Sequence, residues 1–444
     1  MGLRFVRASL AGGVVLLGAA FSARSASGQM AAAAPKNVPI GDWLVAPVAE
    51  LRLRGEYVRD LDGRDRGAVT ERARLGADVQ RGAVEARIVL QDARLATVDD
   101  AAPPPWRLAP LAQSGAYEAW AEAHTAAARP TFVRAGRQPV TWGEGRLLGA
   151  ADWSPAGRSL DAVRARMPVH DAAFELLAAA LSEAGDALPS VYGAVFGARE
   201  EWALAPLFAV ESYVLARLTQ GALPDGVDPS VMGQTDTGSL RLGGDARGWT
   251  WGIEGAYQLG RAKAVRGGVD RAAWAAAGHV AYTFERLLWT PTIGAGVSHA
   301  SGDGGGGTYR AFDPLLPDVH VWHGALDLFA WSNEQEASAH VDFDPFADAI
   351  ARLEYRYARL VESADEWHTA YLARVGEAPG NGHGDLGHEI DASLAWSPFV
   401  PIELRAGYSA IVLGDGARAV LQTTTITPAS VSHFAFLQAA LQMP

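Results

Sequence analysis

Short stretches in which apolar and charged residues alternate recur along the whole chain. In residues 48–60, one set of alternate positions is apolar and the other is mostly charged: Leu51, Leu53, Gly55 and Tyr57 against Arg52, Arg54, Glu56 and Val58. Successive side chains of a β-strand point to opposite faces, so this alternation predicts strands with one apolar face and one polar face.

Sixteen stretches of this kind are predicted strands, and clusters of Gly, Asp, Asn and Pro separate them as turns require. They are residues 48–60, 69–80, 83–93, 116–124, 131–138, 159–167, 190–199, 249–259, 274–284, 292–300, 320–331, 336–343, 351–359, 388–397, 402–411 and 433–443. We expect one or two more, for instance within residues 204–218. Residues 172–184 are rich in Ala and Leu and predict a short extracellular helix, whereas the glycine run 302–307 predicts a loop.

The start of the chain has the order of a secretory signal peptide. Arg4 and Arg7 precede an apolar run that ends at Phe21, and small residues follow it. We expect cleavage after Gly28, which leaves 444 − 28 = 416 residues in an exported chain. Residues 29–47 are then a short leader, and residues 48–444 form one domain because no linker divides them.

The residue types in the two alternating sets decide the fold class. A soluble β-sandwich also alternates, and a large secreted sandwich or propeller is the alternative. Here the polar set contains many Arg, Glu and Asp, and the 14 Trp and 11 Tyr include many near predicted strand ends, as in interfacial girdles. We therefore predict an all-β fold: a transmembrane antiparallel β-barrel of the Gram-negative outer-membrane type, with about 18 strands.

Composition excludes several other classes. The 38 basic and 50 acidic residues give a net charge of −12, which disfavours nucleic-acid binding. No run of 18 uncharged apolar residues occurs, and the mean hydropathy is only +0.02, so transmembrane helices are not expected. The absence of cysteine excludes disulfides, thiol catalysis and thiolate-bound metals.

Three stretches of the sequence contain longer motifs in a defined order. Residues 134–166 read RAGRQPVTWGEGRLLGAADWSPAGRSLDAVRAR, with the GRQ strand, the G-x-G-R-L-x-G turn and the R-x-L-D-x-V-R strand in order. Residues 299–327 contain ASGD, a glycine-rich loop and FDPLLPDVHVWHGALD, and residues 387–408 read GHEIDASLAWSPFVPIELRAGY. These stretches resemble the alginate export family of outer-membrane barrels. The resemblance implies an 18-stranded barrel that passes an anionic polysaccharide outward through an arginine-lined constriction, with loops or a periplasmic turn as gates.

Arginine suits such a cargo because its planar fork holds a carboxylate through two parallel hydrogen bonds. Residues 129–170 contain seven Arg against three acids, whereas residues 271–444 contain nine against twenty. We predict that eight arginines form the anion-selective wall of the pore: Arg52, Arg54, Arg72, Arg74, Arg134, Arg137, Arg164 and Arg166. The alternative, which can coexist with it, is a neutral network in which the lumen arginines pair with Glu56, Glu71, Glu85, Glu118, Glu122 and Asp161.

The remaining motifs are weak evidence for phosphate binding, metal binding or catalysis. The turn GEGRLLG at 143–149 lacks the Lys-Ser/Thr ending of a phosphate-binding loop. Oxygen ligands near residues 301–318 suit a solvated loop better than calcium. Predicted alternation places His320 and His323 on opposite faces, so we expect no metal site, and no Ser–His–acid spacing indicates an enzyme.

We therefore predict a monomeric outer-membrane channel for passive export of an alginate-like polyuronate. It requires no cofactor, and its expected partners are the polysaccharide or its oligosaccharides, outer-membrane lipid and lipopolysaccharide, and periplasmic export components. One alternative is a general porin for small solutes, which the acidic C-terminal half would suit. A second is a plugged barrel that serves as a structural scaffold for a partner.

Overall fold

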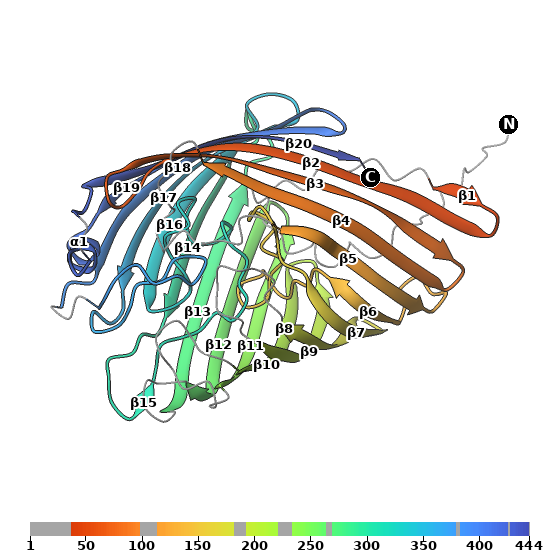
Figure 1. Ribbon diagram of the computed structural model, residues 1–444, viewed down its shortest axis with the longest axis horizontal. Coiled ribbons are helices and arrows are strands. Elements are labelled where there is room, and N and C mark those ends of the chain that lie inside the picture. The colour runs from red at the N-terminus through yellow and green to blue at the C-terminus, as the bar shows by residue number, and fades with distance from the viewer. Residues whose placement is uncertain are drawn as a thin grey trace.

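A closed antiparallel β-barrel surrounds loops that fold into its lumen (Figure 1). The computed structural model describes residues 37–97, 113–181, 192–220, 233–262, 269–378, 382–424 and 427–443. The predicted signal peptide, residues 1–28, lies outside the described residues. Strand β2 pairs with β20 and closes the ring. No helix in the described part of the chain is long and apolar enough to cross a membrane.

Twenty strands are present in the described residues, and eighteen of them form the wall. These are β2 (Trp43–Arg59), β3 (Asp65–Arg81), β4 (Val84–Thr97), β5 (Gln113–His124), β6 (Phe132–Gln138), β7 (Leu160–Val169), β8 (Ala172–Leu181), β9 (Tyr192–Ala205), β10 (Phe208–Gln220), β11 (Gly233–Ala246), β12 (Trp249–Ala262), β13 (Val269–Thr283), β14 (Thr292–Ala300), β16 (Glu334–Phe343), β17 (Ala349–Leu360), β18 (Asp385–Phe399), β19 (Ile402–Leu413) and β20 (Val431–Met443). Strand β1 (Val38–Ile40) pairs with β2, and β15 (Thr308–Tyr309) pairs in parallel with β13. Helix α1 (Asp415–Gln422) follows β19.

The wall turns its apolar residues outward and its charged residues inward. On β2, 53% of Leu51 is exposed on the outer surface, whereas only 6% of the neighbouring Arg52 is exposed. This is the reverse of a soluble sandwich, because lipid surrounds the barrel and the polar lumen lies inside it. The predicted all-β barrel of about 18 strands is confirmed.

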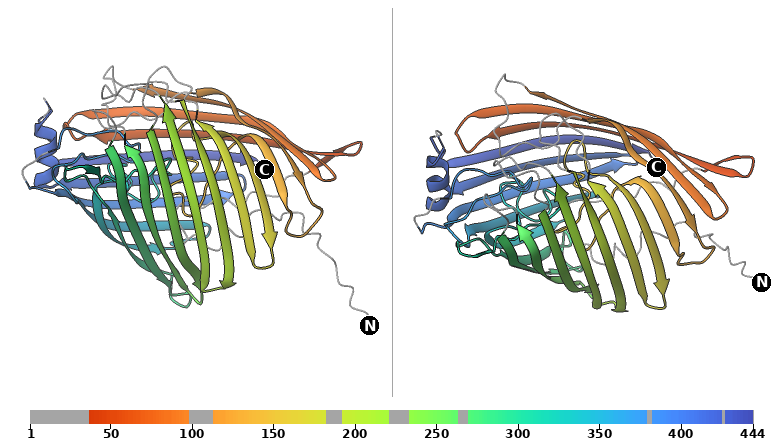
Figure 2. Two further views of the ribbon diagram at one scale, coloured as in Figure 1. Left: turned by 90° about the horizontal axis from the view of Figure 1, so that it is seen from below. Right: turned by 60° about the horizontal axis from the view of Figure 1, so that its bottom comes forward.

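The two ends of the barrel differ in the length of their connections. Short turns such as residues 170–171, 206–207 and 247–248 lie at the same end as β1, and Figure 2 shows β1 far from α1. The long connections 139–159, 301–333 and 361–384 leave the opposite end. Outer-membrane barrels have short periplasmic turns and long extracellular loops, so the β1 end is periplasmic.

Fifteen of the sixteen predicted strands form, and residues 320–331 do not. That stretch lies in the connection 301–333, where His320 and Asp327 adopt positive φ angles of 65° and 57° that no strand accommodates. Its alternation indicates a wall strand, but Leu326, Leu328 and Phe329 are buried among lumen loops instead.

The expected helix at residues 172–184 is wrong, because residues 172–181 form strand β8. The alternation there is apolar on both faces: 61% of Leu176 is exposed on the outer surface, and the adjacent Leu177 is buried inside. Strand β10 covers the additional strand suspected within residues 204–218. Strand β11 was not predicted because Thr, Ser and Gly, rather than charged residues, occupy most of its inward positions. Strand β2 begins at Trp43, inside the predicted leader 29–47.

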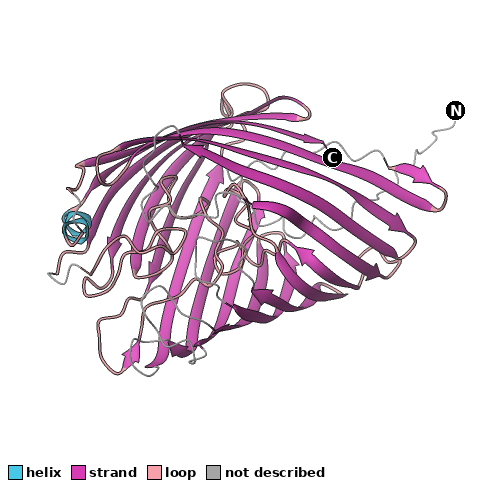
Figure 3. Cartoon of the chain, viewed as in Figure 1, coloured by secondary structure: helices cyan, strands magenta, loops and turns pink. Residues whose placement is uncertain are grey.

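Two connections fold into the lumen and pack there against each other. We call residues 139–159 loop A and residues 301–333 loop B; both belong to the loops drawn inside the ring of strands in Figure 3. Backbone bonds join them, from Gly149 N to the Leu316 oxygen (2.9 Å) and from Leu316 N to the Leu147 oxygen (3.1 Å). The lumen is therefore structured by a folded plug rather than by solvated chain.

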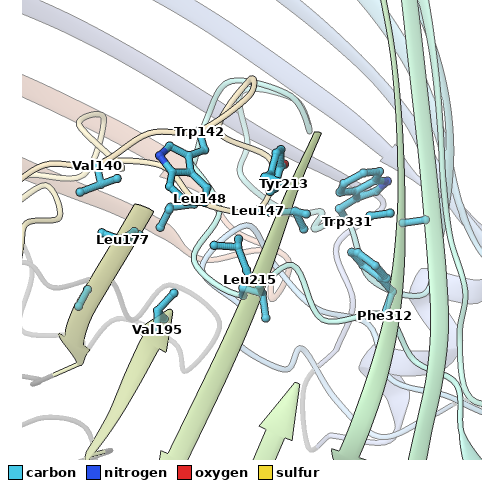
Figure 4. Close-up of a cluster of buried hydrophobic side chains, with 14 of the residues drawn as sticks. Val140, Trp142, Leu147, Leu148, Leu177, Val195, Tyr213, Leu215, Phe312 and Trp331 are labelled. Atoms are coloured by element: carbon cyan, nitrogen blue, oxygen red, sulfur yellow. The ribbon is translucent and has the colours of Figure 1, made fainter. Parts of the chain in front are cut away.

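The plug has an apolar core of its own (Figure 4). Trp142 and Leu148 of loop A are buried with Phe312 and Trp331 of loop B against small and aliphatic side chains of the wall. A second cluster joins Leu328 and Phe329 of loop B to the connection 361–384, α1 and the end of β19. Each buried Leu or Phe stabilises this arrangement by about 1.5–3 kcal/mol.

Candidate functional site

Seven of the eight predicted arginines lie on the lumen face of four wall strands. They are Arg52 and Arg54 on β2, Arg72 and Arg74 on β3, Arg134 on β6, and Arg164 and Arg166 on β7. The strand register places Arg52 opposite Arg72 and Arg134 opposite Arg164. The sheet therefore brings these cations into two groups, one on β2–β3 and one on β6–β7.

Arg137 faces the outside of the barrel. Its register partners are Ala119 and Asp161, and its Nη1 lies 3.4 Å from an oxygen of the exposed Asp161 carboxylate. Three residues separate it from Arg134, and an odd spacing on a strand places two side chains on opposite faces. Arg137 is thus not part of the lumen surface.

The group on β2–β3 holds the backbone of loop A. Arg52 donates to the carbonyl oxygens of Asp152 (2.7 Å) and Ser154 (2.9 Å), and Arg54 donates to that of Trp153 (3.0 Å). The Arg54 guanidinium also stacks over the Trp153 ring at 3.9 Å, a cation–π contact. These arginines therefore position loop A inside the lumen.

Two arginines bind the Asp152 carboxylate in the way that they would bind the carboxylate of an anionic ligand. Arg72 donates to its two oxygens through Nη1 (2.9 Å) and Nη2 (3.2 Å), and Arg74 adds a third bond of 3.0 Å. Burial would raise the pKa of Asp152, but the Arg72, Arg74 and Arg52 guanidinium groups outweigh it and hold the pKa below its ordinary value. The side chain is 56% exposed although it lies deep inside the barrel, so it contacts lumen water.

Glu50 completes this group from the wall. It pairs with Arg72 and, at 3.2 Å, with Arg74. Glu56 pairs with Arg54 at 2.6 Å. The group therefore contains four guanidinium groups and three carboxylates. Only Asp152 of these three acids belongs to a loop, so it is the acid that can leave without disturbing the wall.

The group on β6–β7 is also paired but is more accessible. Arg134 contacts Glu122 at 2.8 Å and stacks over Trp120 at 3.6 Å. Arg164 and Arg166 share Glu175 at 2.7 and 3.4 Å, and Arg166 also reaches Glu201 at 2.6 Å. Their side chains keep between 15% and 21% of their surface exposed.

Every one of the seven lumen arginines therefore has an acidic partner. The sequence had indicated Glu56 and Glu122 as partners, and both are found. Glu118 pairs with Arg87 at 3.3 Å and Glu71 with Arg94 at 3.9 Å, outside the seven. An ion-paired network is thus present in this part of the lumen, but of the acids predicted for it only Glu56 and Glu122 pair with these seven arginines.

Several participants were not identified from the sequence. Asp152 comes from a loop, Glu175 from the segment expected to be helical, and Arg241 from the strand that was not predicted. Arg241 pairs with Glu144 of loop A at 2.5 Å. Alternation with apolar neighbours was a usable signal for Glu175, between Phe174 and Leu176, and for Arg241, between Leu240 and Leu242, but not for Asp152.

The glycines of the G-x-G-R-L-x-G turn allow loops A and B to approach closely. Gly145 has a φ of +77°, and its carbonyl accepts a bond from Asp318 N at 2.7 Å. A Cβ on Gly149 would lie 2.7 Å from the Asp318 Cβ, closer than real atoms approach. The motif is thus a packing device between two loops, not a phosphate cradle.

Arg158 fastens the same junction from loop A. Its Nη1 donates to the carbonyl oxygens of Gly149 (2.9 Å), Leu316 (2.7 Å) and Pro317 (2.9 Å). Burial at this junction raises the pKa of Asp318 to about 6, although the charge of Arg158 opposes the shift. The junction therefore contains a carboxyl group that titrates near neutral pH.

Most of the histidines and loop acids that are candidate metal ligands have separate partners. His299 stacks on Trp274, whereas His320 stacks on Trp153 at 3.5 Å and lies 3.3 Å from Asp327. Asp313 binds Arg217, so the loop acids do not converge on one point. His323 alone among the three histidines meets two other potential ligands, Glu334 and Glu336.

The closed barrel, its lipid-facing apolar surface and its charged lumen define an outer-membrane β-barrel of the channel-forming type. Residues 48–425 match the family described as alginate export, and the chain belongs to this family. Among curated proteins, no sequence matches the chain.

Several solved barrels are similar in fold. Acinetobacter baumannii OccAB2 has a TM-score of 0.58 and 13% identity, covering 89% of this chain and 97% of that one. Pseudomonas aeruginosa OccK2 (OpdF) in complex with glucuronate has a TM-score of 0.56 and 13% identity, with coverages of 90% and 98%. Pseudomonas aeruginosa OccK11 (OpdR) has a TM-score of 0.52 and 14% identity, with coverages of 90% and 96%. At these identities the likeness shows the fold alone.

Proposed function

We propose that the protein is a passive outer-membrane exporter of an anionic, alginate-like polyuronate that moves along the arginine groups of the lumen. The observation that carries the proposal is the Asp152 carboxylate held by Arg72 and Arg74, because it occupies the position that a uronate carboxylate would take. Membership of the alginate export family supports the same cargo. Glucuronate, which OccK2 binds in its complex, is a monomer of the same chemical class.

Exchange of carboxylates explains how binding can stay weak enough for transport. A polymer carboxylate that replaces Asp152 gains the two-pronged bond to Arg72 while loop A moves aside. Because Asp152 competes for the same site, net binding stays modest, as passage through a pore requires. The concentration gradient of the polymer, or its synthesis upstream, sets the direction of transport. Periplasmic export components would deliver the polymer to the channel. The channel acts as a monomer without a cofactor.

The test is a bilayer measurement on the mature chain. The reversal potential under a salt gradient gives the ion preference, and a polyuronate is then added to one side. We expect anion selectivity and block by the polyuronate, both reduced when Arg134, Arg164 and Arg166 are replaced by alanine together. Arg137→Ala is the matched control, because it removes an arginine from the outer face, and it should leave both readings unchanged.

Two outcomes would contradict the proposal. Cation selectivity or indifference to polyuronate would make the protein a general porin for small solutes. Unchanged selectivity in the triple variant would show that the β6–β7 group does not determine the anion selectivity.

A closed scaffold is a second candidate, favoured by the two apolar clusters that loops build inside the barrel. A permanently plugged barrel should give a silent bilayer although it is folded, and a structural partner should co-purify with it. Steady conductance from the purified protein would exclude this candidate.

A further inference from the structure

Three potential metal ligands converge where loop B rejoins the wall. His323 comes from loop B, and Glu334 and Glu336 come from the lumen face of β16. One donor atom from each residue lies within 4.8 Å of the other two. Only 7%, 2% and 3% of these residues is exposed, so the group is enclosed rather than spread over a surface.

One carboxylate oxygen of the group has no hydrogen-bond donor among the described residues. Ser298 Oγ donates to Glu334 Oε1 at 2.7 Å, but Glu334 Oε2 is buried and receives no hydrogen bond from any described residue. A buried carboxylate oxygen normally has a donor, because leaving it without one costs about 1–3 kcal/mol or more. The orphaned oxygen therefore points to a missing cation or proton.

A single arginine, which is shared with a third acid, is paired with the two carboxylates of this group. Arg356 donates to Glu336 at 2.6 Å, but it also binds Glu354 at 2.5 Å. Glu334 forms no ion pair with an arginine or lysine among the described residues, and its neighbour at 3.9 Å is the His323 ring. Two adjacent buried carboxylates with a shared guanidinium need further neutralisation.

We propose that His323, Glu334 and Glu336 form a site for a divalent transition metal ion of the zinc class. Bonds of about 2.0–2.1 Å in a tetrahedral site place ligand atoms about 3.3 Å apart. His323 Nδ1 lies 3.2 Å from Glu336 Oε1 and 3.9 Å from Glu334 Oε1, so small side-chain movements complete this geometry. The imidazole favours zinc over calcium or magnesium, which prefer all-oxygen ligands.

The ion would act as a clamp between loop B and the wall. His323 belongs to the plug and the two glutamates to β16, so a shared metal joins the two parts. The inference does not depend on the exported cargo, since it concerns the attachment of loop B rather than the arginine groups.

The test is metal binding to the folded barrel in detergent. Protein stripped with EDTA is titrated with ZnCl₂ by calorimetry and by competition with a chromophoric chelator, and we expect one ion per chain. Glu334→Gln and His323→Ala should each weaken binding at least roughly tenfold, the scale seen when a metal site loses support. Substituting Co²⁺ for Zn²⁺ should give visible absorption bands in the wild type that both variants lose.

The matched control is His340→Ala, which removes another lumen histidine of β16 that lies outside the group. The His340→Ala variant should bind zinc as the wild type does. Heat-modifiable gel mobility verifies that every variant is folded. Absence of binding by the folded wild type would overturn the proposal and indicate that Glu334 and Glu336 share a proton. Equal binding by wild type, Glu334→Gln and His323→Ala would also overturn it, since the ion would then lie elsewhere.

Discussion

Asp152 links loop A to the arginines of β2 and β3. It is half exposed to lumen water, yet three arginines hold its pKa below the ordinary value. The arginine side chains are buried, but the exposed Asp152 carboxylate leaves one side of these ion pairs open to the lumen, where another anion can approach. A loop carboxylate in this position can therefore act as an internal competitor for an anionic cargo.

Replacing Asp152 with asparagine should strengthen polyuronate binding. The variant removes the competing charge but keeps a side chain of the same shape, so Arg72 and Arg74 become available to the polymer. We expect block at a concentration about fivefold lower, which corresponds to about 1 kcal/mol of binding free energy. A titration of bilayer conductance with polyuronate measures the blocking concentration. Asp161→Asn, on the outer face, is the control, and weaker block by Asp152→Asn would refute the competitor role.

The junction between the loops should respond to pH through Asp318. Its pKa is about 6 when the loops are docked, against an ordinary value of 3.8, because burial favours the neutral acid. The docked state therefore binds the proton more tightly, and this stabilisation is complete below about pH 3.8 and lost as the pH rises through 6.

We accordingly expect the open probability of the channel to rise between about pH 4 and 6 in single-channel recordings. The charged neighbours of Asp318 are Arg158, which favours its ionisation, and Asp152, which opposes it. Asp318→Asn cannot ionise and should remain closed to the same extent at both ends of this range. A pH response that persists in Asp318→Asn would place the titrating group elsewhere.

At the scale of elements, loops A and B behave as one folded unit. Their backbones bond directly, their glycines permit the contact, and their apolar side chains share a core with the wall. Segments packed in this way open cooperatively rather than residue by residue. The passage of a polymer between them would require the two loops to separate.

A disulfide between the loops should suppress conductance. Leu148 and Leu316 are partners in a short parallel bridge, which places their backbones at a separation that a disulfide can span. The natural chain has no cysteine, so Leu148→Cys with Leu316→Cys forms a single defined bond. We expect oxidation to reduce bilayer conductance severalfold and a reductant to restore it.

Each single-cysteine variant is a control, and its bilayer conductance should not change when the oxidant is added. Full conductance in the oxidised double variant would mean that ions and polymer pass beside the joined loops rather than between them.

At the scale of the whole molecule, stability depends on the match between the outer surface and lipid. Leu240 lies near the middle of β11 on the outer face, and Gln234 lies near the end of the same face. Leu240→Arg should lower the free energy of unfolding in lipid vesicles by about 2–4 kcal/mol, and Gln234→Arg by about 0–1 kcal/mol, because the cost depends on depth. Urea titration of folded protein in vesicles measures both. Equal costs would mean that β11 does not cross the membrane as described.

The sequence by itself determined the wall of this protein. Alternation with a period of two is a local property of a strand, so fifteen strands and the inward direction of Arg52, Arg72 and Arg164 could be read without a structure. The same rule excludes Arg137 from the lumen, since three residues separate it from Arg134. It was included only because it belongs to the GRQ motif.

Only the tertiary structure decided what fills the lumen and which charges meet there. Residues 320–331 alternate like a strand, yet they fold into the plug because contacts with distant loops, not local pattern, bury them. Asp152 reaches Arg72 across 80 residues, and His323 meets Glu334 and Glu336 only after loop B returns to the wall. Such contacts depend on the path of long connections, and no period in the chain encodes that path, whereas the period of the strands encodes the wall.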